Sequence, residues 1–180
     1  LLDSKATKAN ILQAFTELAN KSGKDSSVFI YISSHGGQIQ NGAYAGEYLL
    51  PVDAVYQDDE TLADTAISSE EITQGLRSIS ARKLVVVFDC CHSGGIGQPK
   101  NATYSPELKA GFTNDFYKSL AVGSGRVIIA SSRPDEYSWI MPGAKNSLFT
   151  HYFLEGLSGG VTAPGGFIRI FDVFDYIQPR

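Results

Sequence analysis

The stretch KLVVVFDCCHSGG, residues 83–95, passes from a run of apolar residues directly into two cysteines, a histidine, a serine and two glycines. Its first part, KLVVVFD (83–89), does not alternate between apolar and polar residues, which is typical of a strand buried on both faces. VFIYIS (28–33) and RVIIASS (126–132) have the same character and are also rich in β-branched or aromatic residues. These three runs predict the buried strands of one sheet.

Two amphipathic helices are predicted ahead of KLVVVFD. In the first, apolar residues recur at helical spacing after Thr7. The second begins at Ser68 or Ser69, where Glu71 or Glu70 can complete a capping box. Both patterns indicate helices that bury one face.

Further elements follow the same alternation of strand and helix. SLFTHYFLEGL (147–157) predicts a third helix, and FIRIFDVFDYI (167–177) predicts a short strand or turn leading into a helix. The Gly-, Pro- and polar-rich stretches 38–65 and 94–115 indicate long loops. Alternating strands and helices favour an α/β fold with a parallel sheet and right-handed crossovers.

Composition and charge narrow the class of protein. A chain of 180 residues that is 43% hydrophobic and 19% charged predicts a single domain spanning residues 1–180. The net charge of −4, without a basic block, argues against nucleic-acid and membrane partners. No apolar run reaches the roughly 20 residues that span a bilayer, and LLDSKATKAN lacks the features of a signal peptide, so we expect a cytoplasmic protein.

Two motifs carry candidate chemistry at the ends of predicted strands. SSHGG (33–37) follows the first strand and DCCHSGG (89–95) follows the second, and parallel strands bring such ends to one edge of the sheet. A cysteine nucleophile needs a histidine that favours the thiolate and later protonates the leaving group, and Cys91 and His35 supply this pair. The backbone N–H groups of Gly36 and Cys91 can stabilise the oxyanion. Adjacent cysteines lack the usual spacing of a zinc site and disfavour a disulfide.

The two motifs together resemble the histidine and cysteine motifs of caspase-like cysteine peptidases, especially metacaspases and bacterial orthocaspases. The two residues are 56 positions apart, close to the spacing of about 50 known for caspases. YLLPVDA and SLFTHYFLEGL are also similar to stretches of that family. The resemblance implies a caspase-like α/β/α sandwich with a mostly parallel central sheet, which lacks the family's first strand in this chain. It also implies that Cys91 is the nucleophile, His35 its partner and Cys90 a small buried hydrophobe.

The same resemblance places Asp89 and Ser33 in the pocket for P1, the residue before the scissile bond. A carboxylate in that pocket favours arginine or lysine. Two structural alternatives stay open: Asp89 caps nearby backbone N–H groups, and Ser33 satisfies its local backbone.

A second stretch bears on substrate choice. YSWIMPGAKNS (137–147) resembles the caspase stretch whose arginine holds a substrate aspartate, but Ile140 occupies that position here. The missing guanidinium favours a basic P1 residue over aspartate. The residues expected to line the same cleft are Asp135, Glu136 and Tyr137.

The reaction requires no cofactor. Calcium, which many metacaspases bind, has a depleted ligand set here, because Asp53 and Glu70 match family positions whereas Ser69 and Gln98 replace aspartates. We therefore expect a cysteine endopeptidase whose partners are protein or peptide substrates. The alternative is a caspase-like regulatory or interaction subunit, active only when a partner or a missing N-terminal segment completes the cleft.

Overall fold

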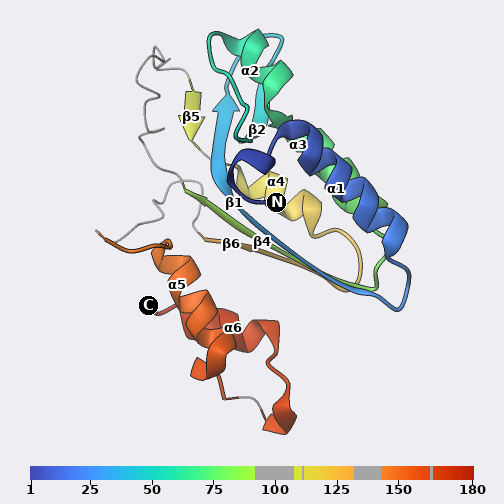
Figure 1. Ribbon diagram of the computed structural model, residues 1–180, viewed down its shortest axis with the longest axis vertical. Coiled ribbons are helices and arrows are strands. Elements are labelled where there is room, and N and C mark those ends of the chain that lie inside the picture. Colours follow the sequence, from blue (N-terminus) through green and yellow to red (C-terminus); the bar gives the residue numbers. More distant parts are fainter. Residues whose placement is uncertain (92–107, 111, 132–142, 163) are drawn as a thin grey trace. The chain divides into compact units, whose positions relative to one another are not determined.

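The computed structural model describes residues 1–91, 108–110, 112–131, 143–162 and 164–180 (Figure 1). Its Cα positions group into two compact units, Leu1–Tyr137 and Ser138–Arg180. The first unit contains η1 (Asp3–Lys5), α1 (Lys8–Lys21), β1 (Ser27–Ile39), β2 (Gly46–Leu50), α2 (Asp59–Thr65), β3 (Ile67–Ser68), α3 (Ser69–Ser78), β4 (Lys83–Cys91), β5 (Leu108–Ala110), α4 (Asn114–Leu120) and β6 (Arg126–Ala130). The second contains α5 (Leu148–Glu155), η2 (Gly156–Gly160), η3 (Pro164–Gly166) and α6 (Ile170–Ile177).

The described strands form a six-stranded sheet in the order β3-β2-β1-β4-β6, with β5 paired to β1. Its centre is parallel: β4 pairs with β1 on one side and with β6 on the other. The three apolar runs are therefore confirmed as adjacent parallel strands of an α/β fold. Strands β2, β3 and β5 add antiparallel pairs at the periphery, so the sheet is mixed.

The prediction of two long loops is wrong in part. The stretch 38–65 contains the end of β1, all of β2 and all of α2. Within 94–115, residues 108–110 form β5 and α4 begins at Asn114, while 94–107 and 111 fall outside the described residues. Short elements flanked by glycine and polar residues escaped the periodicity argument, because that argument needs a longer window.

The predicted helix starts are confirmed. The Thr7 hydroxyl accepts a hydrogen bond from the N–H of Asn10, at 3.3 Å. Ser68 and Glu71 form the reciprocal capping box, with the Ser68 N–H 2.8 Å from the Glu71 carboxylate. In the second unit, Ser147 caps α5, and α6 is a helix with no strand assigned at 167–169. None of the helices in the described segments has the length and apolar content that a membrane span needs.

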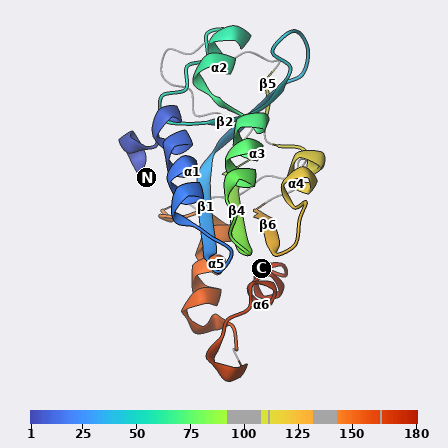
Figure 2. The same ribbon diagram turned by 90° about the vertical axis from the view of Figure 1, so that its right-hand side faces the viewer.

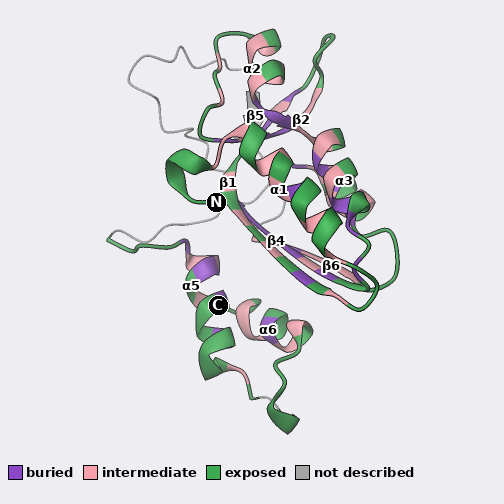
Figure 3. Ribbon diagram, turned by 45° about the vertical axis from the view of Figure 1, so that its right-hand side comes forward, coloured by how far each residue is buried: buried purple, intermediate pink, exposed green. Residues whose placement is uncertain are grey.

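Helices α1, α3 and α4 cover one face of the central strands (Figure 2). Buried residues are purple in Figure 3 and lie on α1, α3 and the central strands. Four aromatic rings join α4 to β4, and the Phe112 and Phe116 rings stack with their centroids 4.6 Å apart. Burying such a ring contributes about 1.5–3 kcal/mol, which accounts for a seven-residue helix that has no long periodic pattern. The buried cluster includes Phe15, Val28, Ile72, Leu76, Leu84, Val86, Phe88, Cys90, Phe112, Phe116 and Leu120.

Gly125, just before β6, makes a specific prediction about stability. Its φ is +76°, and a Cβ there would lie 1.9 Å from the Arg82 carbonyl oxygen. We expect Gly125→Ala to lower the free energy of unfolding by more than about 3 kcal/mol, because strain and a backbone clash add together. Urea denaturation of the variant and the wild type measures the difference in the free energy of unfolding.

Gly123→Ala is the matched control, because Gly123 also has a positive φ, +118°, but its Cβ would meet only the Arg126 side chain at 3.5 Å. The control should lose only the strain energy, about 1–3 kcal/mol. Equal losses for the two variants would show that the clash with the Arg82 carbonyl is not the cause.

Candidate active site

The two motifs meet where the parallel pairing of β1 with β4 ends, at His35 and Cys91. SSHGG was expected to follow the first strand, but it lies within β1, which continues to Ile39 through antiparallel pairing with β2 and β5. In the parallel register, His35 pairs with Cys91 and Ser33 pairs with Asp89. Neighbouring strands lie about 4.8 Å apart, and residues two apart along one strand are separated by about 6.6 Å. Since alternate residues of a strand share a face, these four positions form two adjacent rows on one face of the sheet.

The two cysteines are the last two residues of β4. Cys90 is 2% exposed and belongs to the core beneath α1, α3 and α4. Successive strand residues point to opposite faces, so position 91 is on the face of its register partner His35. The core around Cys90 is strongly desolvated: burial raises the pKa of the neighbouring Tyr117, and the charge of Glu47 acts in the same direction. The interpretation of Cys90 as a small buried residue agrees with this placement.

The part of β1 around His35 is paired or hydrogen-bonded to β2, β4 and β5. His35 is exposed, and the Ser34 hydroxyl donates a 2.6 Å hydrogen bond to the Leu50 carbonyl oxygen on β2. Gly36 is buried and lies between two pairings of β1: the one with β4, which ends at His35, and the one with β5, which begins at Gly37. The proposed oxyanion donor is therefore next to the point where β4 ends.

Asp89 is almost completely buried and has a partner that sequence analysis missed. It is 3% exposed, and the Tyr31 hydroxyl donates a 3.0 Å hydrogen bond to its Oδ2. Ser33, its register partner, is exposed. Tyr31 is two residues before Ser33, so strand alternation could have placed it on this face, but a contact across 58 positions has no sequence signal.

Asp135, Glu136 and Tyr137 lie outside the described residues, as does Ile140. For Cys91 the structure describes the backbone position in β4. That Asp135, Glu136 and Tyr137 line the substrate cleft stays a prediction.

The carboxylates considered for calcium have structural partners. Asp53 Oδ1 accepts a 2.9 Å hydrogen bond from the N–H of Lys8, the first residue of α1. Glu70 Oε2 accepts a 3.2 Å hydrogen bond from the Ser69 hydroxyl. Within the described ranges, no group of three or more His, Cys, Asp or Glu side chains is arranged to hold a metal ion. Gln98 lies outside these ranges.

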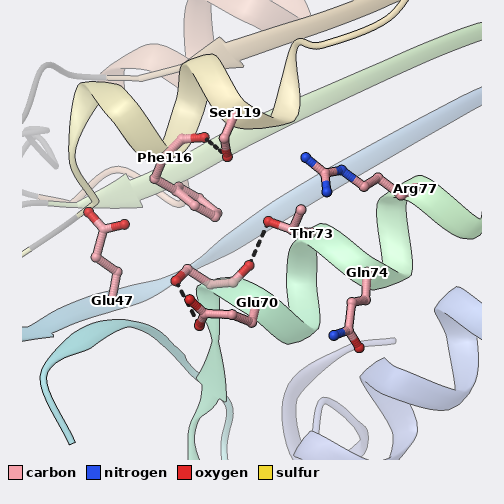
Figure 4. A pocket seen from close by; sticks show the side chains of 8 residues that line it. Glu47, Glu70, Thr73, Gln74, Arg77, Phe116 and Ser119 are labelled. Atoms are coloured by element: carbon pink, nitrogen blue, oxygen red, sulfur yellow. Dashed lines mark hydrogen bonds between the residues drawn. The ribbon is translucent and has the colours of Figure 1, made fainter.

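A separate cavity of about 360 Å³ lies between α3, α4 and β2, on the side of the sheet that the helices cover. Figure 4 shows Glu47 at one end of the cavity, beside α4, and Arg77 at the opposite end of the cavity, on the last turn of α3. Glu47 accepts a hydrogen bond from the N–H of Thr113, the cap of α4, so this carboxylate stabilises the start of that helix. The cavity does not include the His35 and Cys91 positions. Its lining is Glu47, Ser69, Glu70, Thr73, Gln74, Arg77, Phe116 and Ser119.

Comparisons with known proteins bear on the family and the fold. The family model described as Caspase domain matches residues 2–171. A crystal structure of a protein from Geobacter sulfurreducens is similar in fold, with a TM-score of 0.64 and 19% sequence identity, over 98% of this chain and 70% of that one. No curated protein sequence matches the chain significantly.

Proposed function

Because this chain belongs to the caspase-domain family, we propose that it is a cysteine endopeptidase that cleaves after arginine or lysine. Membership of the family supports a caspase-like peptidase. The observation that carries the finer proposal is the register of β1 and β4, in which His35 and Cys91 are direct cross-strand partners.

In the proposed reaction, the Cys91 sulfur attacks the scissile carbonyl carbon after its proton has passed to His35. The backbone N–H groups of Gly36 and Cys91 donate hydrogen bonds to the oxyanion. The tetrahedral intermediate collapses, the C–N bond breaks, and His35 donates its proton to the leaving amine. His35 then accepts a proton from the water that hydrolyses the thioester, and the Cys91 thiol is restored.

The proposed P1 pocket is centred on Asp89. Its row in the sheet, shared with Ser33, precedes the row of Cys91 and His35 by about 6.6 Å along the strands. A buried carboxylate at that point favours a guanidinium or ammonium group over a neutral or acidic side chain. We further propose that Asp135, Glu136 and Tyr137 line the cleft.

The finer classification follows the motif. The D-x-C-H-S-G pattern at 89–94 supports a metacaspase or orthocaspase type of enzyme. We further propose that the enzyme works in the cytoplasm and needs no metal cofactor. Asp53, one of the carboxylates that resemble calcium ligands, accepts a hydrogen bond from the N–H of Lys8 at the start of α1.

A panel of fluorogenic peptides that differ only at P1 tests the proposal. We expect release of the fluorophore after Arg and Lys, little release after Asp, and the same rates with calcium or with a chelator. Preference for Asp would overturn the pocket while leaving the nucleophile in place. No turnover of any peptide, with or without calcium, would favour the alternative of a regulatory or interaction subunit.

A further inference from the structure

Tyr31 contacts Asp89, the carboxylate at the centre of the proposed P1 pocket. It is on β1, in the row before Ser33 and Asp89, and its register partner is Val87 on β4. Its hydroxyl crosses from β1 to β4 and donates to Asp89 Oδ2 at 3.0 Å. Tyr31 therefore contacts the carboxylate from the side farther from Cys91.

This contact acts on the orientation of the carboxylate. The terminal torsion of an aspartate is broad, so the carboxylate plane is set by its hydrogen-bond partners rather than by intrinsic rotamer preference. Asp89 is 3% exposed, and in such surroundings the attraction between charges repays desolvation only when the geometry is good. A donor that holds one carboxylate oxygen in place therefore determines how well a cation can pair with it.

We propose that Tyr31 is a positioning residue for substrate specificity, which acts through Asp89 and not on the reacting atoms. This inference rests on the proposed function, because it assumes that Asp89 binds a basic P1 side chain. The rigid tyrosine ring holds the hydroxyl at a fixed distance from β1, and the hydroxyl donates the hydrogen bond that orients the Asp89 carboxylate.

Tyr31→Phe removes the hydroxyl and keeps the ring. For a peptide with Arg at P1, we expect KM to rise about tenfold, the loss typical of one hydrogen bond to a charged group, while kcat changes little. For the same peptide with citrulline at P1, a neutral analogue of arginine, both constants should stay unchanged. The preference for Arg over citrulline therefore falls about tenfold.

Tyr176→Phe is the matched control. Tyr176 also donates to a carboxylate, with its hydroxyl 2.8 Å from Glu155 Oε1, but both residues belong to the second unit. This variant loses a similar hydrogen bond and should keep the kinetic constants of the wild type.

A double-mutant cycle with Asp89→Asn gives a second measurement. If Tyr31 acts through Asp89, Tyr31→Phe should have no further effect on the Arg peptide once Asp89 is Asn. Additive losses would overturn the inference, as would an unchanged KM for Tyr31→Phe. A parallel loss for the Arg and citrulline peptides with a lower melting temperature would show a merely structural role. If the wild type itself does not prefer basic P1 residues, the proposed function fails, and that result is visible before any variant is made.

Discussion

Cys91→Ala is expected to abolish peptide hydrolysis, with kcat/KM falling by on the order of 10⁴-fold or more, because no thiolate is left to attack the carbonyl. Cys90→Ala, one position away, should leave kcat/KM nearly unchanged. The difference follows from strand geometry, since Cys90 lies in the core beneath the helices and position 91 belongs to the opposite face, with His35. Initial rates on the Arg peptide measure both variants.

Comparing the stability of Cys90→Ala and Cys91→Ala separates an effect on catalysis from an effect on folding. Cys90 is 2% exposed, so its truncation leaves a small cavity and should lower the free energy of unfolding by about 1–2 kcal/mol. Cys91→Ala should melt close to the wild type. Labelling with iodoacetamide gives an independent readout, with alkylation of wild type expected at Cys91. An active Cys91→Ala variant would overturn the assignment of the nucleophile.

Asp89→Asn should lower kcat/KM for Arg and Lys peptides by about 10²- to 10³-fold, because a buried cation loses its counter-charge. The amide has nearly the same shape as the carboxylate, so packing is preserved. The citrulline peptide should lose little, since its side chain carries no charge. Steady-state kinetics on the three peptides measure the change as a loss of charge selectivity.

Ser33→Ala provides the control for this row of the sheet. Ser33 pairs with Asp89 in the register but is exposed and uncharged. Removing its hydroxyl should therefore lower kcat/KM for the Arg and Lys peptides by about tenfold or less. An equal loss for Asp89→Asn on every peptide, citrulline included, would indicate that Asp89 supports the structure of the site and not the choice of P1.

Much of the fold could be predicted from the sequence. The uninterrupted apolar runs around Val28, Val86 and Ile128 predicted parallel strands correctly. The expected burial on both faces holds for Val86 and Val87 of β4, but Phe29 and Tyr31 of β1 are exposed. Thr7 and Ser68 marked helix starts correctly, because capping is a contact between residues three apart.

The missed elements depend on distant contacts. Helix α4 is seven residues long, and its Phe116 is buried against Phe88 of β4. Strand β2 has five residues and is held by pairing with β1. An isolated segment of either length has too little periodic pattern to be recognised, because its stabilisation comes from partners elsewhere in the chain.

For the candidate site, the sequence by itself determined the chemical groups available: a histidine and a cysteine shortly after apolar runs, flanking glycines and an aspartate two residues before Cys91. Those are local properties, readable from residue type and spacing. Only the tertiary structure decided that His35 pairs with Cys91, that Cys90 turns into the core, and that Tyr31 donates to Asp89. The reason is that strand register and burial arise from the pairing of β1 with β4, which joins residues more than fifty positions apart.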